Sequence, residues 1–342
     1  MKENHLIRVA VLGATGIIGQ VFVWLLHRHP RFIPAVLCAS EKNHGREYGE
    51  AVPWQLPFPM DEGIKKIKLG KIDADHFKKK GIRIIFSGLP SPIARRIEGD
   101  LRRAGFLIFS NAGAFRDDPE VPIVIPECNP QDLDSIPIQQ ERYGGSIITN
   151  ANCSATGLAT VLAPLREYQP REIFVSTYQS ISGAGYPGLP AMDILHNAIP
   201  HIPGEEDKIR RELPKILHQE IAIHATCVRI PVLYGHLESV WVKFRRRLIC
   251  QDIRRAWEKA QGALKTDIFP QNPVEYIEAS DFPQPRLAFG GHPPGMPVYI
   301  GRLRREGDAF GFLLLVNNVV KGGAGGSVQN ADLYLHRCGG IL

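Results

Sequence analysis

The sequence predicts an α/β protein with two domains. Its 342 residues exceed what one hydrophobic core usually supports. Short apolar runs alternate with helical patterns in the first half, which is typical of a parallel sheet covered by helices. Longer strands with alternating faces follow in the second half, which indicates an α+β domain. With 44% hydrophobic and 22% charged residues, the composition is that of an ordinary globular chain rather than a disordered one.

The charge and cysteine patterns exclude several classes of protein. The net charge is +6, but the basic runs Lys78–Lys80 and Arg245–Arg247 are short and isolated, so we expect solvated surface and no nucleic-acid partner. A mildly basic balance also suits an enzyme with an anionic cofactor and substrate. The six cysteines form no Cys-x-x-Cys pair and no metal-ligand spacing, so we expect a reduced compartment and no metal site. Signal-peptide and transmembrane patterns are absent, which predicts a cytoplasmic protein without a membrane partner.

The first elements predict a nucleotide-binding turn. A β-rich run at Ile7–Leu12 is followed by the pattern G-x-x-G-x-x-G over Gly13–Gly19, and helical spacing of apolar residues continues from Val21. Small residues in such a turn let the backbone approach a pyrophosphate, which the helix N-terminus binds. We therefore expect a Rossmann-type dinucleotide-binding domain. The expected cofactor contacts in the turn are Gly13, Thr15, Gly16, Ile17 and Ile18.

The loop after the second expected strand, Ala35–Ala39, bears on the choice of cofactor. Ser40 stands where an NAD-binding site usually carries Asp or Glu for the ribose 2′-hydroxyl. Ser40, Lys42 and Arg46 supply hydroxyl and basic groups that can hold a 2′-phosphate. We therefore expect NADP rather than NAD, although Glu41 counts against this and a solvated turn is the alternative.

The alternation of strands and helices continues along the first half. Strands are expected at residues 82–88 and 106–110, with a helix at 92–103 between them. Residues 42–80 are irregular and rich in Pro, Gly and Lys, and we interpret them as containing an insertion.

Cys153 lies where the pattern changes from strand to helix. Ile147–Thr149 is a short β-branched run, and helical spacing begins at Ser154. A thiol at a helix N-terminus meets unpaired N–H groups and the positive end of the helix dipole, so we expect a lowered pKa and a nucleophilic Cys153. A buried and inert cysteine is the alternative, but the polar neighbours Asn152 and Ser154 argue against it.

The second half predicts a sheet of long strands. They are expected at residues 172–179, 221–232, 237–248, 298–305 and 310–320, with a helix at 253–264. Strands with alternating faces predict a one-sided sheet, which packs against a helix layer or another subunit. The last helix, at 326–337, follows a glycine-rich turn, and we expect it to return to the first domain.

In this order, the motifs resemble aspartate-semialdehyde dehydrogenases of the archaeal and fungal branch. The resemblance spans nearly the whole chain and rests on Gly13–Gly16, Asn152–Ser154, Gln179 with Ser182–Gly185, Gly204–Glu206 with Lys208, Arg229 before Gly235–His236, and Gln329–Ala331. It implies a Rossmann domain of residues 1–152 and 325–342 and a catalytic and dimerisation domain of residues 153–324. The implied protein is a homodimer or homotetramer that uses NADP to convert aspartyl phosphate into aspartate semialdehyde and phosphate. That reaction belongs to lysine, threonine and methionine biosynthesis.

The resemblance also implies catalytic roles for individual side chains. Cys153 matches the nucleophile, His236 the acid/base histidine, and Gln179 the residue that orients the substrate beside the cysteine. Arg229 matches the arginine that holds the substrate α-carboxylate, for which a bidentate guanidinium is suited. Glu205 matches the acid that binds the substrate amine.

Further positions correspond to binding residues. Those expected around the acyl phosphate or inorganic phosphate are Arg116, Asn152 and Lys208, and those expected at the cofactor are Ser182, Gly183 and Asn330. The chain departs from the family pattern at Asn43–His44, in a more glycine-rich terminal loop, and at Asp332. The first two departures touch cofactor contacts, so they bear on the choice between NADP and NAD.

Other functions remain open at this point. N-acetyl-glutamyl-phosphate reductases share the fold and chemistry, but usually carry a Gly-Cys-Tyr-Pro motif at the nucleophile, and their acylated amine would leave Glu205 without a charge partner. Malonyl-CoA reductase, whose thioester substrate lacks the amine, belongs to the same branch. A non-catalytic NADP-binding regulator would be expected to lack Cys153 or His236, and both are present.

Overall fold

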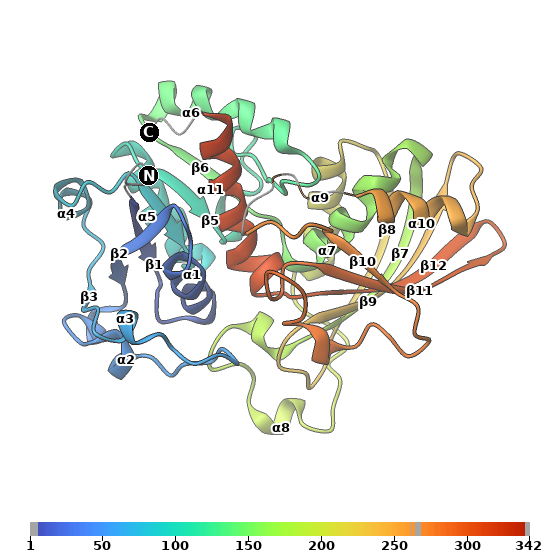
Figure 1. Cartoon of the computed structure of the whole chain (residues 1–342), viewed down its shortest axis with the longest axis horizontal. Helices are drawn as coiled ribbons and strands as arrows, with labels where there is room; N and C mark the ends of the chain where they lie inside the picture. The colour runs from blue at the N-terminus through green and yellow to red at the C-terminus, as the bar shows by residue number, and fades with distance from the viewer. Residues whose placement is uncertain (1–5, 261, 263, 265–267, 339–342) are drawn as a thin grey trace. The chain divides into compact units, whose positions relative to one another are not determined.

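The computed structural model describes residues 6–260, 262, 264 and 268–338 (Figure 1). The chain divides into two compact units. The first contains Met1–Val124, Gln131–Asn150 and Ala324–Leu342, and the second contains Ile125–Pro130 and Ala151–Gly323. No helix in the described part of the chain is long and apolar enough to span a membrane.

The first unit is built on a six-stranded parallel sheet in the order β3-β2-β1-β4-β5-β6. Its strands are β1 (Ile7–Leu12), β2 (Phe32–Cys38), β3 (Leu69–Gly70), β4 (Ile84–Ser87), β5 (Leu107–Ser110) and β6 (Ser146–Thr149). The strand order reverses at β1, and such sheets bind ligands at this switch point. The predicted doubly wound domain is confirmed.

The helices of the first unit include those that the sequence predicted and others that it did not. They are α1 (Ile17–His27), α2 (Tyr48–Ala51), α3 (Glu62–Lys65), α4 (Ala74–Lys79), α5 (Ser91–Arg103), α6 (Ile136–Tyr143) and α11 (Gly325–Arg337). Helix α11 contacts α1 and β5, and Arg31 Nη2 pairs with Asp332 Oδ1 at 3.1 Å. The expected return of the last helix to the first domain is therefore confirmed.

At two of its glycines, the turn between β1 and α1 leaves no room for a side chain. Gly13 has a φ of +69°, and a Cβ there would lie 2.9 Å from the Gly88 carbonyl oxygen. A Cβ on Gly19 would lie 2.1 Å from the Gly13 carbonyl oxygen. Both positions therefore require glycine, which lets the turn pack closely against its own backbone and against the residue that follows β4.

Residues 42–80 are part of the domain rather than an irregular insertion, which corrects our interpretation. They contain α2, α3, α4 and the edge strand β3, whose Leu69 pairs with Leu37 of β2. Tyr48 is fully buried and donates its hydroxyl to the Ala14 carbonyl at 2.9 Å. A two-residue strand leaves no periodic pattern in the sequence, so it could not be recognised there.

The second unit is built on a mixed sheet in the order β10-β11-β12-β9-β7-β8. Its strands are β7 (Pro170–Gln179), β8 (Ala222–Arg229), β9 (His236–Phe244), β10 (Val274–Ile277), β11 (Val298–Glu306) and β12 (Ala309–Val316), and its helices are α7 (Cys153–Leu162), α8 (Ala191–Ile194), α9 (Glu205–Leu217) and α10 (Cys250–Lys259). The sheet is antiparallel in its middle and parallel at both edges, where β10 pairs with β11 and β7 pairs with β8. Strands β7 and β8 are parallel because α9 forms the crossover between them.

Helices α7, α9 and α10 contact strands of this sheet, and Figure 1 shows them along one side of it. On the other side the side chains alternate outward along the strands, and Phe174, Tyr178 and His224 are exposed. The predicted one-sided sheet is therefore confirmed.

The segment Ile125–Pro130 is held by the second unit. Arg166 Nη2 donates to the Cys128 carbonyl at 3.0 Å, and Lys321 Nζ forms an ion pair with Glu127 Oε2 at 2.7 Å. Both side chains of this pair are buried. These tertiary contacts explain why the segment lies outside the first unit, although the sequence placed residues 1–152 together.

A buried carboxyl in the first unit makes stability depend on pH. Glu98 on α5 is fully buried and accepts a hydrogen bond from Ser110 Oγ at 2.9 Å. Burial raises its pKa from 4.5 to about 7, despite the hydrogen bonds from Ser87 and Ser110 that lower it. The folded pKa exceeds the unfolded one, so stability falls as pH rises from about 4.5 to 7 and then stays lower, a loss of roughly 3 kcal/mol.

We expect Glu98→Gln to remove this loss, because glutamine keeps the hydrogen bonds without a charge. The variant should be more stable than the native chain above pH 7, and the difference should shrink toward pH 4.5. Melting temperatures of both proteins across this range test the prediction. Parallel curves at all pH values would show that Glu98 is not the titrating group.

Candidate active site

Cys153 is the first residue of α7, four positions after β6 ends at Thr149, which confirms the predicted strand-to-helix junction. Asn152 caps the helix: its Oδ1 accepts from the backbone N–H groups of Ser154 at 3.1 Å and Ala155 at 3.3 Å. A Cβ on Gly322 would lie 2.9 Å from the Cys153 Cα, so the glycine-rich turn after β12 passes directly against the cysteine.

The thiol contacts the predicted histidine. Cys153 Sγ lies 3.1 Å from Nε2 of His236, which is fully buried at the start of β9. The turn before it requires Gly235, whose φ is +88° and whose added Cβ would lie 2.9 Å from Ala288 Cβ. Residues 83 positions apart are thus joined into one reactive pair.

The pKa values of this pair correct one prediction. Although part of Cys153 is open to solvent, protein atoms surround the sulfur, and burial raises the pKa of the thiol to about 12. The expectation that the helix N-terminus lowers it is wrong, because desolvation outweighs the helix dipole. Burial, together with the charge of Arg229, lowers the pKa of His236 to about 3. Both groups are therefore neutral in the free protein near pH 7, and a thiolate forms when the thiol proton is transferred to a neighbouring group.

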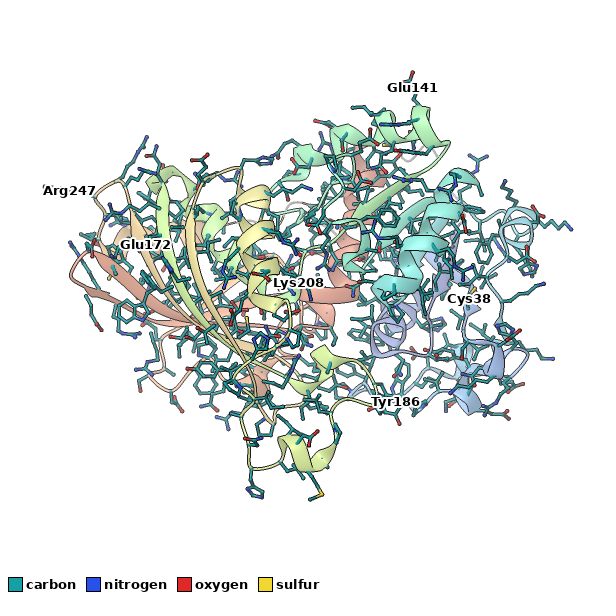
Figure 2. All side chains as sticks on the ribbon, turned by 180° about the vertical axis from the view of Figure 1, so that it is seen from behind. Cys38, Glu141, Glu172, Tyr186, Lys208 and Arg247 are labelled. Atoms are coloured by element: carbon teal, nitrogen blue, oxygen red, sulfur yellow. The ribbon has the colours of Figure 1, made fainter. Side chains whose placement is uncertain are left out.

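Two groups of opposite charge flank the pair. Arg229 ends β8, is 6% exposed, donates to the Ser180 carbonyl at 2.6 Å, and has no carboxylate partner among the described residues. Glu205 begins α9 and is 8% exposed; its Oε1 pairs with Lys208 Nζ at 2.5 Å, and its Oε2 accepts from Asn152 Nδ2 at 2.8 Å. Burial acts to raise the pKa of Glu205, but Lys208 and Asn152 outweigh it, so the carboxylate is ionised. Lys208 is labelled on α9 in Figure 2.

Gln179, at the end of β7, belongs to a buried polar network beside the cysteine. Its Nε2 lies 3.2 Å from both Ser154 Oγ and Thr177 Oγ1 and 3.5 Å from Glu205 Oε2. Glu238, two residues after His236, is fully buried, and neither of its carboxyl oxygens has a hydrogen-bond partner of ordinary geometry among the described residues. Burial raises the pKa of Glu238 well above the usual range, so this acid is neutral.

The glycine-rich loop after β7 reaches the same site. A Cβ on Gly183 would lie 2.8 Å from Arg229 Nη1 and 3.3 Å from His236 Cε1, so no larger residue fits without displacing the guanidinium. The second unit therefore brings together Asn152, Cys153, Gln179, Ser182, Gly183, Glu205, Lys208, Arg229 and His236 of the predicted site.

The remaining predicted residues belong to the first unit. Ser40 precedes a short 3-10 turn, Lys42 is exposed, and Arg46 donates to Asn43 Oδ1 at 3.2 Å and to the Glu50 carbonyl at 3.1 Å. Asn330 donates to the Val124 carbonyl at 3.0 Å, and its buried Oδ1 has no partner in the described structure. Arg116 donates to the Asn111 carbonyl at 3.1 Å.

Besides Glu238, the sequence analysis missed Ser180 and Asn318. Ser180 follows Gln179, and Asn318 follows β12. Both are buried. Ser180 N donates to Nδ1 of His236, and Asn318 Oδ1 accepts from the N–H of the neighbouring Gly235. Their only signal in the sequence is that polar residues directly follow two apolar strands, which is where site residues gather.

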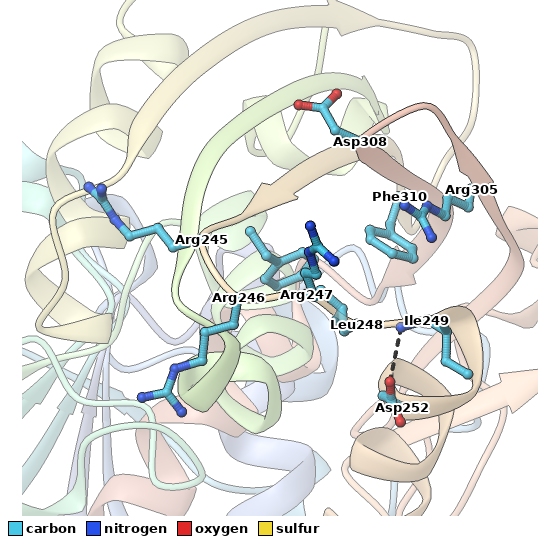
Figure 3. A pocket seen from close by; sticks show the side chains of 10 residues that line it. Arg245, Arg246, Arg247, Leu248, Ile249, Asp252, Arg305, Asp308 and Phe310 are labelled. Carbon is cyan, nitrogen blue, oxygen red and sulfur yellow. Dashed lines mark hydrogen bonds between the residues drawn. The ribbon is translucent and has the colours of Figure 1, made fainter.

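A separate pocket of about 640 Å³ lies at the other end of the second sheet (Figure 3). It is lined by Phe244, Arg245–Ile249, Asp252, Arg305, Asp308 and Phe310. The guanidinium groups of Arg245, Arg246 and Arg247 point in different directions in Figure 3, and Arg247 projects from the edge of the unit in Figure 2. Because these cations do not point toward a common ligand position, this pocket is a weaker candidate for an active site than the surroundings of Cys153.

Comparison with known proteins agrees with this geometry. Residues 8–136 match the family model "Semialdehyde dehydrogenase, NAD binding domain", and residues 162–321 match "Semialdehyde dehydrogenase, dimerisation domain". An aspartate-semialdehyde dehydrogenase of Archaeoglobus fulgidus is 40% identical, over 96% of this chain and 97% of the relative. The chain belongs to the aspartate-semialdehyde dehydrogenase family. It is therefore an oxidoreductase with an NAD(P)-binding domain, and the predicted resemblance is confirmed.

A solved structure and a second kind of relative define the family further. The aspartate-semialdehyde dehydrogenase of Candida albicans, solved with NADP, superposes with a TM-score of 0.86 at 31% identity, covering 98% of this chain and 100% of that chain. The malonyl CoA reductase (NADP) of Metallosphaera sedula is 33% identical over 97% of both chains. Family membership alone thus spans two substrate types, and the site residues must decide between them.

Proposed function

We propose that this chain is an NADP-dependent aspartate-semialdehyde dehydrogenase that converts aspartyl phosphate into aspartate semialdehyde and phosphate. The observation that carries the proposal is the 3.1 Å contact between Cys153 and His236, with Arg229 on one flank and Glu205 on the other. Cys153 and His236 supply the covalent chemistry. Arg229 matches an α-carboxylate of the substrate, and Glu205 matches an α-amine. The enzyme acts in the cytoplasm in the biosynthesis of lysine, threonine and methionine.

The chemistry starts at the thiol. Cys153 transfers its proton to His236, its sulfur attacks the acyl carbon, and the carbon–oxygen bond to phosphate breaks, which leaves a thioester and free phosphate. NADPH, when bound by the first unit, would supply the hydride that reduces this thioester. His236 then protonates the sulfur as the carbon–sulfur bond breaks and the aldehyde leaves. Gln179 orients the acyl group beside the sulfur, and Asn152, Lys208 and Arg116 hold the phosphate.

The first unit fits a dinucleotide. The turn is tightly packed, because a Cβ at Gly13 or Gly19 would collide with backbone atoms, and α1 presents its N-terminus at Ile17. Together with Thr15, Gly16 and Ile18, this turn holds the pyrophosphate, while Ser40, Lys42 and Arg46 hold the 2′-phosphate. Ser182, Gly183 and Asn330 complete the cofactor contacts.

A coupled assay tests the function. Oxidation of aspartate semialdehyde should reduce NADP only when inorganic phosphate is present, because phosphate must release the acyl group from Cys153. N-acetylglutamate semialdehyde, whose amine is blocked, and malonate semialdehyde with coenzyme A, which lacks an amine, should be poor substrates. Faster turnover with the malonyl pair would favour the malonyl-CoA reductase function.

Cofactor choice gives a second test. Lys42 is an exposed cation in the part of the chain that the structure describes, and it stands in the loop after β2. We expect NADP to bind at least about tenfold more tightly than NAD, since a phosphate charge gains an ionic partner worth about 1–2 kcal/mol. Lys42→Gln should reduce this preference without changing NAD affinity. Equal affinities of the native chain for both cofactors in a binding titration would refute the 2′-phosphate contact.

Assembly gives a third test. The exposed face of the second sheet carries Phe174, which stacks on His224 at 4.5 Å, and Tyr178. We propose that this face packs against a second copy, either in a homodimer or within a homotetramer built of two such dimers. The native mass in solution should then be at least twice that of the chain. Phe174→Glu should weaken the assembly because it buries an unpaired charge, and a monomeric native protein would contradict the proposal.

A further inference from the structure

His236 is contacted by Ser180 through two different groups. The backbone N–H of Ser180 donates to Nδ1 of His236 at 3.1 Å, and Ser180 Oγ lies 3.2 Å from the same nitrogen. The Ser180 N–H requires an unprotonated Nδ1 and so favours the tautomer of His236 with its proton on Nε2. Ser180 Oγ can instead accept a proton from Nδ1, which favours the other tautomer. In that tautomer Nε2 is unprotonated, and because it lies 3.1 Å from Cys153 Sγ it can take the thiol proton.

Asn318 decides which way the Ser180 hydroxyl points. The Asn318 side chain is buried, and its Oδ1 accepts from Gly235 N and from Ser180 Oγ, both at 3.0 Å. Its Nδ2 donates to Ser182 Oγ at 2.9 Å. Because the Gly235 N–H can only donate, the atom facing it must be Oδ1, and the amide orientation is fixed. The Ser180 hydroxyl proton is therefore directed at Asn318, which leaves a lone pair of Oγ for His236.

We propose that Asn318 is a positioning residue: by accepting the Ser180 hydroxyl proton, it turns a lone pair of Ser180 Oγ toward Nδ1 of His236, so that a bare Nε2 can take the proton of Cys153. In this step the S–H bond breaks, an N–H bond forms at Nε2, and the electron pair stays on sulfur. The inference rests on the proposed function, in which Cys153 is the nucleophile.

Charged groups around the pair remain the same when Asn318 is replaced by a neutral residue. Arg229 reaches the pair from β8, Glu205 and Lys208 reach it from α9, and Glu238, which is neutral, lies further along β9. Cys153 itself is the titratable group from α7. A change in thiol reactivity in an Asn318 variant therefore reports the hydrogen bonds at Nδ1.

Two substitutions test the inference, alone and together. In Asn318→Leu the Ser180 hydroxyl is released to donate to Nδ1, and in Ser180→Ala the acceptor is lost while the backbone N–H remains. Either change should hold the proton on Nε2. We expect alkylation of Cys153 by iodoacetamide at pH 7, followed by mass spectrometry of its peptide, to slow about 10- to 100-fold in each variant. The double variant should be no slower, because both changes remove the same interaction.

The pH profile and a control complete the test. The pH at half-maximal alkylation should rise in both variants, since the thiol loses its proton acceptor. Thr160→Ala removes another buried hydroxyl on the helix of Cys153. Within the described structure this hydroxyl donates to Thr156 O at 2.8 Å, away from the reacting pair, so the variant should be alkylated at the native rate. A merely loosened structure would expose Cys153 and speed alkylation. Native rates in both variants, or single effects that multiply in the double variant, would overturn the inference.

Alkylation needs no substrate, so the test is separable from the proposed function. A native enzyme that fails to turn over aspartate semialdehyde, but whose Cys153 reactivity still depends on Asn318, would contradict the substrate assignment alone. Should Asn318→Leu fail to fold, Ser180→Ala decides the outcome, because it removes one hydroxyl and adds no volume.

Discussion

Replacing Cys153 with serine is expected to lower kcat by at least about 1,000-fold, because a hydroxyl at this position has no comparably nucleophilic ionised form near neutral pH. Cofactor binding should persist, since the glycine turn belongs to the first unit and does not depend on the thiol. The measurements are steady-state turnover and a titration of NADPH fluorescence.

Cys250→Ser is the matched control. Cys250 is also partly exposed and begins a helix, α10, but it has no histidine contact in the described structure. This variant should keep the native rate. A Cys153→Ser enzyme that turns over at a similar rate would rule out the covalent mechanism.

The second large effect concerns the two charges that recognise the substrate. Arg229→Leu should lower kcat/KM with aspartate semialdehyde by at least about 100-fold, because the substrate carboxylate loses its partner in a desolvated site. A substrate analogue without the amine should be impaired equally, since it keeps the carboxylate. Glu205→Gln should impair aspartate semialdehyde strongly and leave the amine-free analogue little changed.

Kinetics of both variants with both compounds separate the two roles. Arg210→Leu, an exposed arginine on α9 that pairs with Glu206 and Asp207, is the control for loss of a guanidinium. It should leave both substrates unaffected. A harmless Glu205→Gln with the amine-bearing substrate would make a malonyl-type substrate the better assignment.

Local patterns predicted the elements that position the site. The glycine turn after Leu12 and the change of period at Cys153 are both properties of neighbouring residues, and both are confirmed. The parallel pairing of β7 with β8 could not be predicted, because it depends on where α9 returns the chain. The pairing of Leu69 with Leu37 involves too few residues to leave a pattern.

The electrostatics of the site depended on packing that the sequence does not reveal. The helix position of Cys153 predicted a lowered pKa, but the pKa is set by the atoms that surround the sulfur. The roles of Ser180 and Asn318 depend on a turn that brings Gly235 to an amide 83 residues away. The packing around the sulfur and the contact between Gly235 and Asn318 leave no periodic or compositional signal in the sequence.

The turn that follows β12 gives the two reacting groups a common support. Asn318 holds Gly235, the residue before the imidazole, and Gly322, four positions later, presses on the main chain of the cysteine. The distance between sulfur and nitrogen therefore depends on the spacing of these two contacts along one short segment. A change in the length of the turn between Asn318 and Gly322 would alter that distance directly.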